Sequence, residues 1–244
     1  MKVVGIIPVR ENSTRLPGKA LKLIKGLPAI VHVYKRSEFS KELDELYVAT
    51  DSEKIKNTIN KFGGKCILTG QHSNGSERIY EASNNIKADL IINIQGDEVL
   101  VDPEHIDILV KAMKEDNKIS YAMGVTEFYE ENSVHDFKVV LSKTYNVLFC
   151  SRSDIPSSSI IKRNNRLKAV FIFGFTKISL GRFVKMEPTP NELREPNEFL
   201  RILENDEKIK AVMMSKAKIS LDTYDDLSII QEIFKTDDLV NDYL

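Results

Sequence analysis

The sequence is poor in cysteine and has no surplus of charge of either sign. Its two cysteines, Cys66 and Cys150, lie inside apolar runs, which indicates buried thiols rather than a disulfide or a metal site. The 35 basic and 36 acidic residues give a formal net charge of -1. A general binder of nucleic acids or membrane surfaces would be strongly basic, so we expect neither partner and infer that any cationic site is local.

Long apolar stretches and secretion signals are also missing. No run approaches the roughly 18 apolar residues that span a bilayer, and no apolar segment follows a basic start at the N-terminus. We therefore expect a cytoplasmic protein. A chain of 244 residues with 42% hydrophobic residues can bury a sizeable core, as one large domain or as a domain with a small lobe.

The first half of the chain alternates short runs rich in Val and Ile with amphipathic stretches. The runs are typical of strands that are buried on both faces of a parallel sheet. The strand candidates are residues 3–9, 46–50, 65–69 and 90–95. The helix candidates are residues 28–39, 53–62, 76–86 and 103–114, with Asp51 and Pro103 as helix-entry signals. This alternation predicts an α/β fold with a doubly wound, Rossmann-like, mostly parallel sheet.

The second half predicts a mixed, antiparallel extension of that sheet. Its apolar runs lie close together, with turn residues between them. The strand candidates are residues 119–128, 138–142, 145–151, 169–177 and 209–214. A polar loop is expected at 153–166, and helices are expected near 195–204 and 224–234. We predict a single domain over residues 1–244, made of an α/β half (1–118), a mixed-strand region (119–194) and returning helices (195–244).

A polar cluster follows each predicted strand of the first half. The cluster after the first strand holds Arg10, Arg15 and Lys19 around a Pro-Gly turn, and the cluster after the fourth holds Asp97 and Glu98. Ligands of open α/β sheets bind outside the carboxyl ends of the strands, so cations and carboxylates at this edge predict a site for a metal-bound polyphosphate. The sequence lacks GxxxxGK[ST], and no GxGxxG follows the first strand, which excludes a Walker A loop and the usual dinucleotide fingerprint.

Each cluster also has a simpler interpretation when it is taken alone. Cationic loops are usually solvated surface. The dipeptide Asn74-Gly75 is compatible with an ordinary hairpin turn, and residues 95–98 are compatible with a plain strand end. The occurrence of all four clusters at one sheet edge favours the polyphosphate site.

Several segments resemble, in order and register, the 3-deoxy-D-manno-octulosonate (Kdo) cytidylyltransferases, or CMP-Kdo synthetases. The segment RENSTRLPGK is similar to the family signature R-x-x-S-x-R-[LF]-P-G-K, and HSNGSER is similar to H-x-S-G-[ST]-[DE]-R. Further along the chain, QGDE, KVVLS with YNVLFCSRSDIP, and SLDTYDDL follow the family pattern. The resemblance covers almost the whole chain and implies a nucleotidyltransferase of the cytidylyltransferase type.

Such an enzyme binds CTP and a small acidic acceptor, uses Mg²⁺, and releases pyrophosphate when the acceptor's anomeric hydroxyl attacks the α-phosphorus. The resemblance further implies a homodimer, formed through residues 120–150 and 160–195, and a role in lipopolysaccharide or capsule biosynthesis. By position in the motifs, the implied catalytic residues are Arg10, Lys19 and Asp97. The implied nucleotide-binding residues are Pro8, Arg10, Ser13, Arg15, Gly18, Lys19, Asn74, Gly75, Arg78 and Gln95. The implied acceptor-binding residues are Gln95, Arg152, Ala169, Glu198 and Phe199, and the implied metal ligands are Asp97 and Asp222.

The chain departs from the family pattern mainly at the acceptor site. Ala169 stands where the family has a histidine, Phe199 stands where it has a glutamine, and Val99 replaces the proline of QGDEP. Sites built to hydrogen-bond a substrate reject partners without the matching groups, so a different acidic acceptor, such as another sugar acid or a phosphonate, is one alternative. Local realignment, with other residues filling these roles, is another. A non-catalytic nucleotide-binding homologue is disfavoured, because the charged residues of the site are all present.

Overall fold

The computed structural model describes residues 1–11, 13, 15–160 and 165–244. The chain folds into two compact units. Unit 1 combines residues Met1–Asp107 with Lys218–Leu244, and unit 2 comprises residues Ile108–Ala217. Unit 1 is therefore built from two stretches of chain that are far apart in sequence. The predicted single domain with its three regions stays a prediction.

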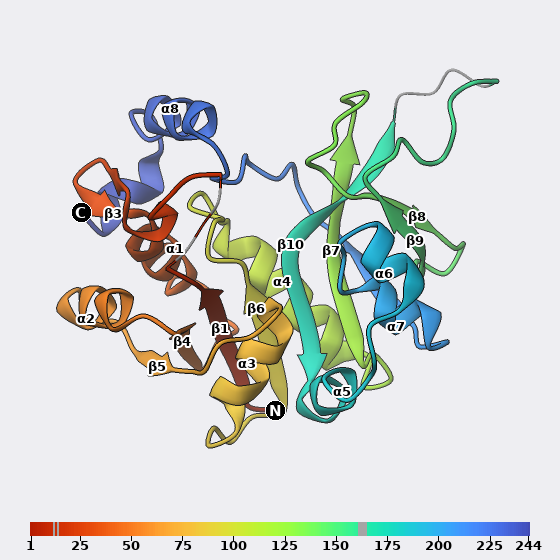
Figure 1. Ribbon diagram of the computed structural model, residues 1–244, viewed down its shortest axis with the longest axis horizontal. Coiled ribbons are helices and arrows are strands. Elements are labelled where there is room, and N and C mark those ends of the chain that lie inside the picture. The colour runs from red at the N-terminus through yellow and green to blue at the C-terminus, as the bar shows by residue number, and fades with distance from the viewer. Residues whose placement is uncertain (12, 14, 161–164) are drawn as a thin grey trace. The chain divides into compact units, whose positions relative to one another are not determined.

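Unit 1 contains a parallel sheet with β1 in its interior (Figure 1). Both neighbours of β1 run parallel to it, and β5 extends the sheet beyond β4. The strands are β1 (Val3–Val9), β4 (Glu45–Thr50), β5 (Cys66–Leu68) and β6 (Leu90–Ile94), in the order β6-β1-β4-β5. All residues of β6 are buried, as expected for a strand covered on both faces. These elements confirm the parallel part of the predicted α/β sheet.

Helices connect these strands much as the amphipathic pattern predicts. They are α1 (Ala29–Ser37), α2 (Glu53–Lys61), α3 (Gly75–Ser83), α4 (Pro103–Glu115) and α8 (Tyr224–Ile233). Two short 3₁₀ helices, η1 (Lys19–Leu21) and η2 (Asp238–Asp242), and a small hairpin of β2 (Leu23–Ile24) and β3 (Leu27–Pro28) complete this description. Helix α4 begins in unit 1 and ends in unit 2. None of the helices within the described residues is long and apolar enough for a membrane span.

Sequence reasoning named the wrong capping residue for one helix and left the start of another undecided. Ser52, not Asp51, caps α2, since its hydroxyl accepts the N–H of Ile55. Asp51 instead accepts a hydrogen bond from Arg78 at 3.0 Å. Asn74 caps α3 by accepting the N–H of Glu77 at 2.8 Å, so Asn74-Gly75 starts a helix and is not a hairpin turn.

The returning segment Lys218–Leu244 is held in unit 1 by buried polar contacts. The Arg36 guanidinium donates to Asp237 at 2.8 Å, and both side chains are almost fully buried. The Nε2 of His32 donates to the carbonyl of Ile24, so Nδ1 accepts the hydroxyl of Tyr243 at 2.8 Å. Burial lowers the pKa of His32 to about 4, which keeps this ring neutral.

Unit 2 contains the mixed strands. Strand β7 runs antiparallel to β10 and parallel to β11, and β8 runs antiparallel to both β10 and β9. The strands are β7 (Tyr121–Phe128), β8 (Lys138–Leu141), β9 (Val147–Ser151), β10 (Arg166–Thr176) and β11 (Ile209–Met213). The fold class is thus confirmed, with antiparallel strands in the second half. The predicted loop 153–166 ends earlier than expected, since Arg166 already belongs to β10, and its residues 161–164 lie outside the described residues.

The helices that follow β10 differ from the single one expected at 195–204. They are α5 (Lys177–Phe183), α6 (Pro190–Arg194) and α7 (Leu200–Glu204). Pro190 starts α6, where its missing N–H costs nothing. The Arg201 Nε donates to Glu192 at 2.8 Å in a buried pair that ties α7 to α6. Such short helices carry too few turns to show a period in the sequence.

Candidate active site

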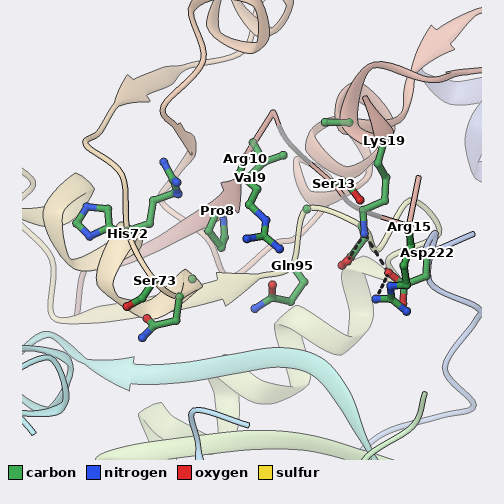
Figure 2. A pocket seen from close by; sticks show the side chains of 16 residues that line it. Pro8, Val9, Arg10, Ser13, Arg15, Lys19, His72, Ser73, Gln95 and Asp222 are labelled. Carbon is green, nitrogen blue, oxygen red and sulfur yellow. Dashed lines mark hydrogen bonds and ion pairs between the residues drawn. The ribbon is translucent and has the colours of Figure 1, made fainter. Parts of the chain in front are cut away.

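A cavity of about 300 Å³ lies in unit 1, at the carboxyl ends of β1 and β6 and the N-terminus of α3 (Figure 2). Its volume suits a small ligand. Nine of the ten nucleotide-binding residues implied by the resemblance line it, together with both implied metal ligands. The lining residues are Pro8, Val9, Arg10, Ser13, Arg15, Lys19, Ala20, His72, Ser73, Asn74, Gly75, Arg78, Gln95, Gly96, Asp97 and Asp222. The structure therefore brings together residues that are separated by more than half of the chain.

Two glycines allow the backbone to form this cavity. A Cβ atom on Gly96 would lie 2.9 Å from the carbonyl oxygen of Pro8, so only glycine permits the loop after β6 to pass so close to β1. Gly18 has a φ of +66° in the left-handed region and precedes η1. Among the described residues, Gly18 is the implied nucleotide-binding residue that does not line the cavity. It forms the turn that leads into Lys19.

The centre of the site is an ammonium group shared by two carboxylates. The Nζ of Lys19 lies 2.7 Å from Oδ2 of Asp97 and 3.1 Å from Oδ1 of Asp222. The guanidinium of Arg15 donates to the same Asp222 oxygen at 2.9 Å. Figure 2 shows Lys19 and Arg15 converging on Asp222. Burial alone would lower the pKa of Lys19, but the charges of Asp97 and Asp222 outweigh it, and the pKa lies above its usual range.

The remaining cations of the cavity differ in how far they are already neutralised. Arg10 is exposed and, within the described part of the chain, pairs with no carboxylate. Arg78 is buried and donates to Thr69 at 2.6 Å and to Asp51 at 3.0 Å. Arg10 is therefore free to meet an anion, whereas Arg78 is committed to holding the wall of the cavity.

The N-terminus of α3 adds backbone donors to the same wall. Helix N-termini attract anions through their free N–H groups and the helix dipole. The Asn74 side chain is occupied with Glu77, through Oδ1 at 2.8 Å and Nδ2 at 2.9 Å. Gln95, on the neighbouring loop, donates to Asn93 at 3.3 Å. Polar amide groups thus line the side of the cavity next to Pro8.

The two carboxylates fit a divalent cation of the magnesium type. No group of three or more His, Cys, Asp or Glu side chains within the described residues forms a ready metal cluster. Asp97 and Asp222 nevertheless converge on one cation, the Lys19 ammonium, from opposite segments of chain. Two carboxylates are what Mg²⁺ usually takes from protein when a phosphate supplies further ligands.

Comparison with known proteins agrees with this geometry. Residues 4–214 match the family described as Cytidylyltransferase. The chain is 38% identical to the 3-deoxy-manno-octulosonate cytidylyltransferase of Fusobacterium nucleatum, over 98% of this chain and 99% of that protein. It is also similar to a solved structure of CMP:2-keto-3-deoxy-manno-octonic acid synthetase complexed with CTP, with 30% identity and a TM-score of 0.92 over 97% of this chain and 99% of the other. The chain belongs to the 3-deoxy-manno-octulosonate cytidylyltransferase family. The chain is similar as well to the 8-amino-3,8-dideoxy-manno-octulosonate cytidylyltransferase of Shewanella pealeana, with 35% identity over 95% of this chain and 98% of that protein.

This cytidylyltransferase carries its implied acceptor-binding residues mainly in unit 2, apart from Gln95 in the cavity. The Phe199 ring is buried and stacks on Phe173, with 3.7 Å between ring centroids. Ala169 is buried in β10. The guanidinium of Arg152 lies 4.2 Å from the centre of the Phe137 ring and donates to the carbonyl of Val134 at 2.6 Å. Glu198 is half-buried just before α7. Their role in binding an acceptor stays a prediction.

Five residues that line the cavity of the enzyme are not among the site residues implied by the resemblance: Val9, Ala20, His72, Ser73 and Gly96. His72 and Ser73 belong to the polar cluster after the third strand, so their place at the edge of the sheet was visible. His72 Nε2 is hydrogen-bonded to the Glu81 carboxylate, and this pairing with a residue of α3 had no signal in the sequence.

Proposed function

We propose that this enzyme transfers CMP from CTP to the anomeric hydroxyl of Kdo and releases pyrophosphate, with Mg²⁺ held by Asp97 and Asp222. The observation that carries the proposal is the pair of carboxylates around Lys19 in a cavity that also presents Arg10 and the N-terminus of α3. The relatives named for Kdo, and the related structure complexed with CTP, support this choice of substrates. The homodimer, the cytoplasmic location and the role in lipopolysaccharide or capsule synthesis stay predictions.

In this proposal the protein acts by positioning and by charge. Arg10, Arg15 and Lys19 neutralise the triphosphate, and Ser13 donates to a phosphate oxygen. The acceptor hydroxyl loses its proton to water as its oxygen forms a bond to the α-phosphorus. The bond from that phosphorus to the bridging oxygen breaks, and its electron pair leaves with pyrophosphate. Such groups accelerate transfer because they are already in place when the charge shifts onto the leaving pyrophosphate. Bound Mg²⁺ would supply a further positive charge at the phosphate oxygens.

Lys19 changes partner in this scheme. In the free enzyme its ammonium is balanced by Asp97 and Asp222. With Mg²⁺ bound, Asp97 and Asp222 would hold the cation, and the Lys19 ammonium would be free to donate to the phosphates. The same side chain thus offsets part of the carboxylate charge in the free enzyme and would support the leaving group when the nucleotide is bound.

The test is pyrophosphate release from CTP by the purified enzyme with Mg²⁺ and Kdo. We expect acceptor-dependent release that Asp97→Asn reduces by at least a hundredfold while the melting temperature is retained, because an amide does not hold Mg²⁺ against a triphosphate. Release without acceptor dependence, or full activity of Asp97→Asn, would contradict the proposal.

A different acidic acceptor is the second candidate, and the apolar, buried Ala169 and Phe199 favour it. The same assay with 8-amino-Kdo, other sugar acids and phosphonates separates the two candidates by kcat/KM. The plain Kdo function is wrong if another acid is used at least tenfold more efficiently than Kdo.

A further inference from the structure

The loop after β6 and the returning segment 218–222 run side by side in opposite directions. The carbonyl of Asp97 accepts the backbone N–H of Leu221 at 3.0 Å. One step further from Asp97 along the loop, the carboxylate of Glu98 accepts the hydroxyl of Ser220. The residue numbers rise on one segment as they fall on the other. The two segments therefore lie antiparallel and are joined by these two contacts, which we call the ladder although they form no β-structure, with Asp97 and Asp222 at one end.

A buried ion pair ties the other end of this ladder. Arg36 donates through Nε to the carbonyl of Val101 at 2.8 Å and through Nη1 to Asp237 at 2.8 Å. Asp237 also accepts the ammonium of Lys218 at 2.8 Å. The loop at Val101 and the segment at Lys218 are thus both held through Arg36 and Asp237.

Between these two ends, the Glu98–Ser220 pair is a side-chain link next to the carboxylates. Glu98 is buried and follows Asp97 directly, and Ser220 precedes Asp222 by two residues. Neither residue is among the described residues that line the cavity. The pair can therefore influence the site only through the placement of Asp97 and Asp222.

We propose that Glu98 and Ser220 are positioning residues that set the distance between Asp97 and Asp222, and with it the affinity of the carboxylate pair for a divalent cation. This inference rests on the metal site of the proposed function. A carboxylate pair must offer its oxygens within narrow limits, because Mg²⁺ demands near-ideal octahedral geometry. The backbone bond from Leu221 to Asp97 fixes one point of the ladder, and the Glu98–Ser220 bond prevents rotation about that point.

The experiment compares Ser220→Ala, which removes the hydroxyl, with Ser220→Thr, which retains it. Ser228→Ala is the matched control, because Ser228 is exposed on α8 and bonds only its own helix within the described structure. Binding of Mn²⁺ is measured by electron paramagnetic resonance in the presence of α,β-methylene-CTP, an analogue whose α–β bridge is not cleaved. Affinity for the analogue alone is measured in EDTA, and melting temperatures are recorded for all variants.

We expect Ser220→Ala to raise the Kd for Mn²⁺ about tenfold, as is common when a group that orients a metal ligand is lost. Its affinity for the analogue in EDTA should stay within twofold of wild type, and Ser220→Thr should restore Mn²⁺ binding to within threefold. A second variant, Glu98→Gln, keeps an acceptor oxygen and should behave like Ser220→Thr.

Two results would overturn the inference in distinguishable ways. If Ser220→Ala binds Mn²⁺ as tightly as Ser228→Ala, or only loses thermal stability, while Asp97→Asn loses Mn²⁺, the pair is a structural link and the metal site stands. If Asp97→Asn binds Mn²⁺ as tightly as wild type, the proposed metal site itself is wrong and the positioning role falls with it.

Discussion

Removal of the Lys19 ammonium should make the nucleotide-free enzyme a better metal binder, although it weakens CTP binding. A divalent cation that binds both carboxylates without nucleotide must displace Nζ from Asp97, at 2.7 Å, and from Asp222, at 3.1 Å. Lys19→Met keeps a side chain of similar length without this competing charge. The variant therefore has opposite expected effects on the two ligands, whereas a general disturbance of the site would weaken the binding of both.

The size of the effect follows from these two contacts. Hydrogen bonds between charged groups contribute about 1.5–3 kcal/mol each when buried. The side chains of Asp97 and Asp222 are 30% and 26% exposed, so solvent screens both contacts and their combined contribution is about 2 kcal/mol. That difference corresponds to a roughly thirtyfold lower Kd for Mn²⁺ in Lys19→Met.

The assay is Mn²⁺ binding by electron paramagnetic resonance without nucleotide, followed by calorimetric titration with CTP in EDTA. Lys235→Met is the matched control, since it removes the same charge from an exposed ion pair with Glu232. Arg15→Met, which frees one contact to Asp222, should fall between the two. If Lys19→Met binds Mn²⁺ no more tightly than Lys235→Met, Lys19 does not compete for the metal position and the reasoning is refuted.

Three further predictions concern stability and the acceptor. The pKa of His32 is lowered to about 4 from its ordinary value of 6.5, so between these pH values the unfolded chain binds a proton that the folded chain does not bind. The free energy of unfolding should therefore fall by up to about 3 kcal/mol as the pH falls from 6.5 to 4. Urea titrations should show a smaller loss over this range in His32→Phe, and an equal loss would show that His32 is not the cause. Asn74→Ala removes the cap of α3 and should cost about 1 kcal/mol of stability, with weaker CTP binding in calorimetry; unchanged urea midpoints would contradict the role of the cap. Ala169→His with Phe199→Gln should raise kcat/KM for Kdo if the acceptor site has diverged, although the lost stack on Phe173 should lower the melting temperature; efficient use of Kdo by the wild type that the double variant does not improve would refute divergence.

The elements that were predictable from sequence are those with a long, clear pattern. The strand Val3–Val9 was predicted with its observed ends, because a run of branched apolar residues buried on both faces has few alternative structures. Four polar clusters then met at one edge of the sheet because parallel strands present the same ends together. Most of the residues that line the cavity could be predicted from the sequence in this way.

The parts that sequence reasoning missed depend on contacts between distant segments or on very short elements. The start of α2 depends on whether Asp51 or Ser52 caps the helix. The Asp51 carboxylate instead accepts a hydrogen bond from Arg78, a partner that the local sequence does not reveal. Helices α5–α7 are short and are stabilised by packing and by the Arg201–Glu192 pair. The sharing of Lys19 between Asp97 and Asp222 also had no sequence signal, although each residue was named, because motifs give identities but not which charges meet.

The division of unit 1 between Met1–Asp107 and Lys218–Leu244 has a consequence for the order of events during synthesis. A nascent chain folds its early segments while later ones are still being added. The parallel sheet and Lys19 are made first, but Asp222 is added only after the whole of unit 2 has been translated. Until then the ammonium of Lys19 has Asp97 but no second carboxylate, and the ladder that holds Asp97 has one side only. The growing polypeptide therefore lacks one carboxylate of the proposed metal site until its final segment docks, and under that proposal incomplete translation products would not consume nucleotide.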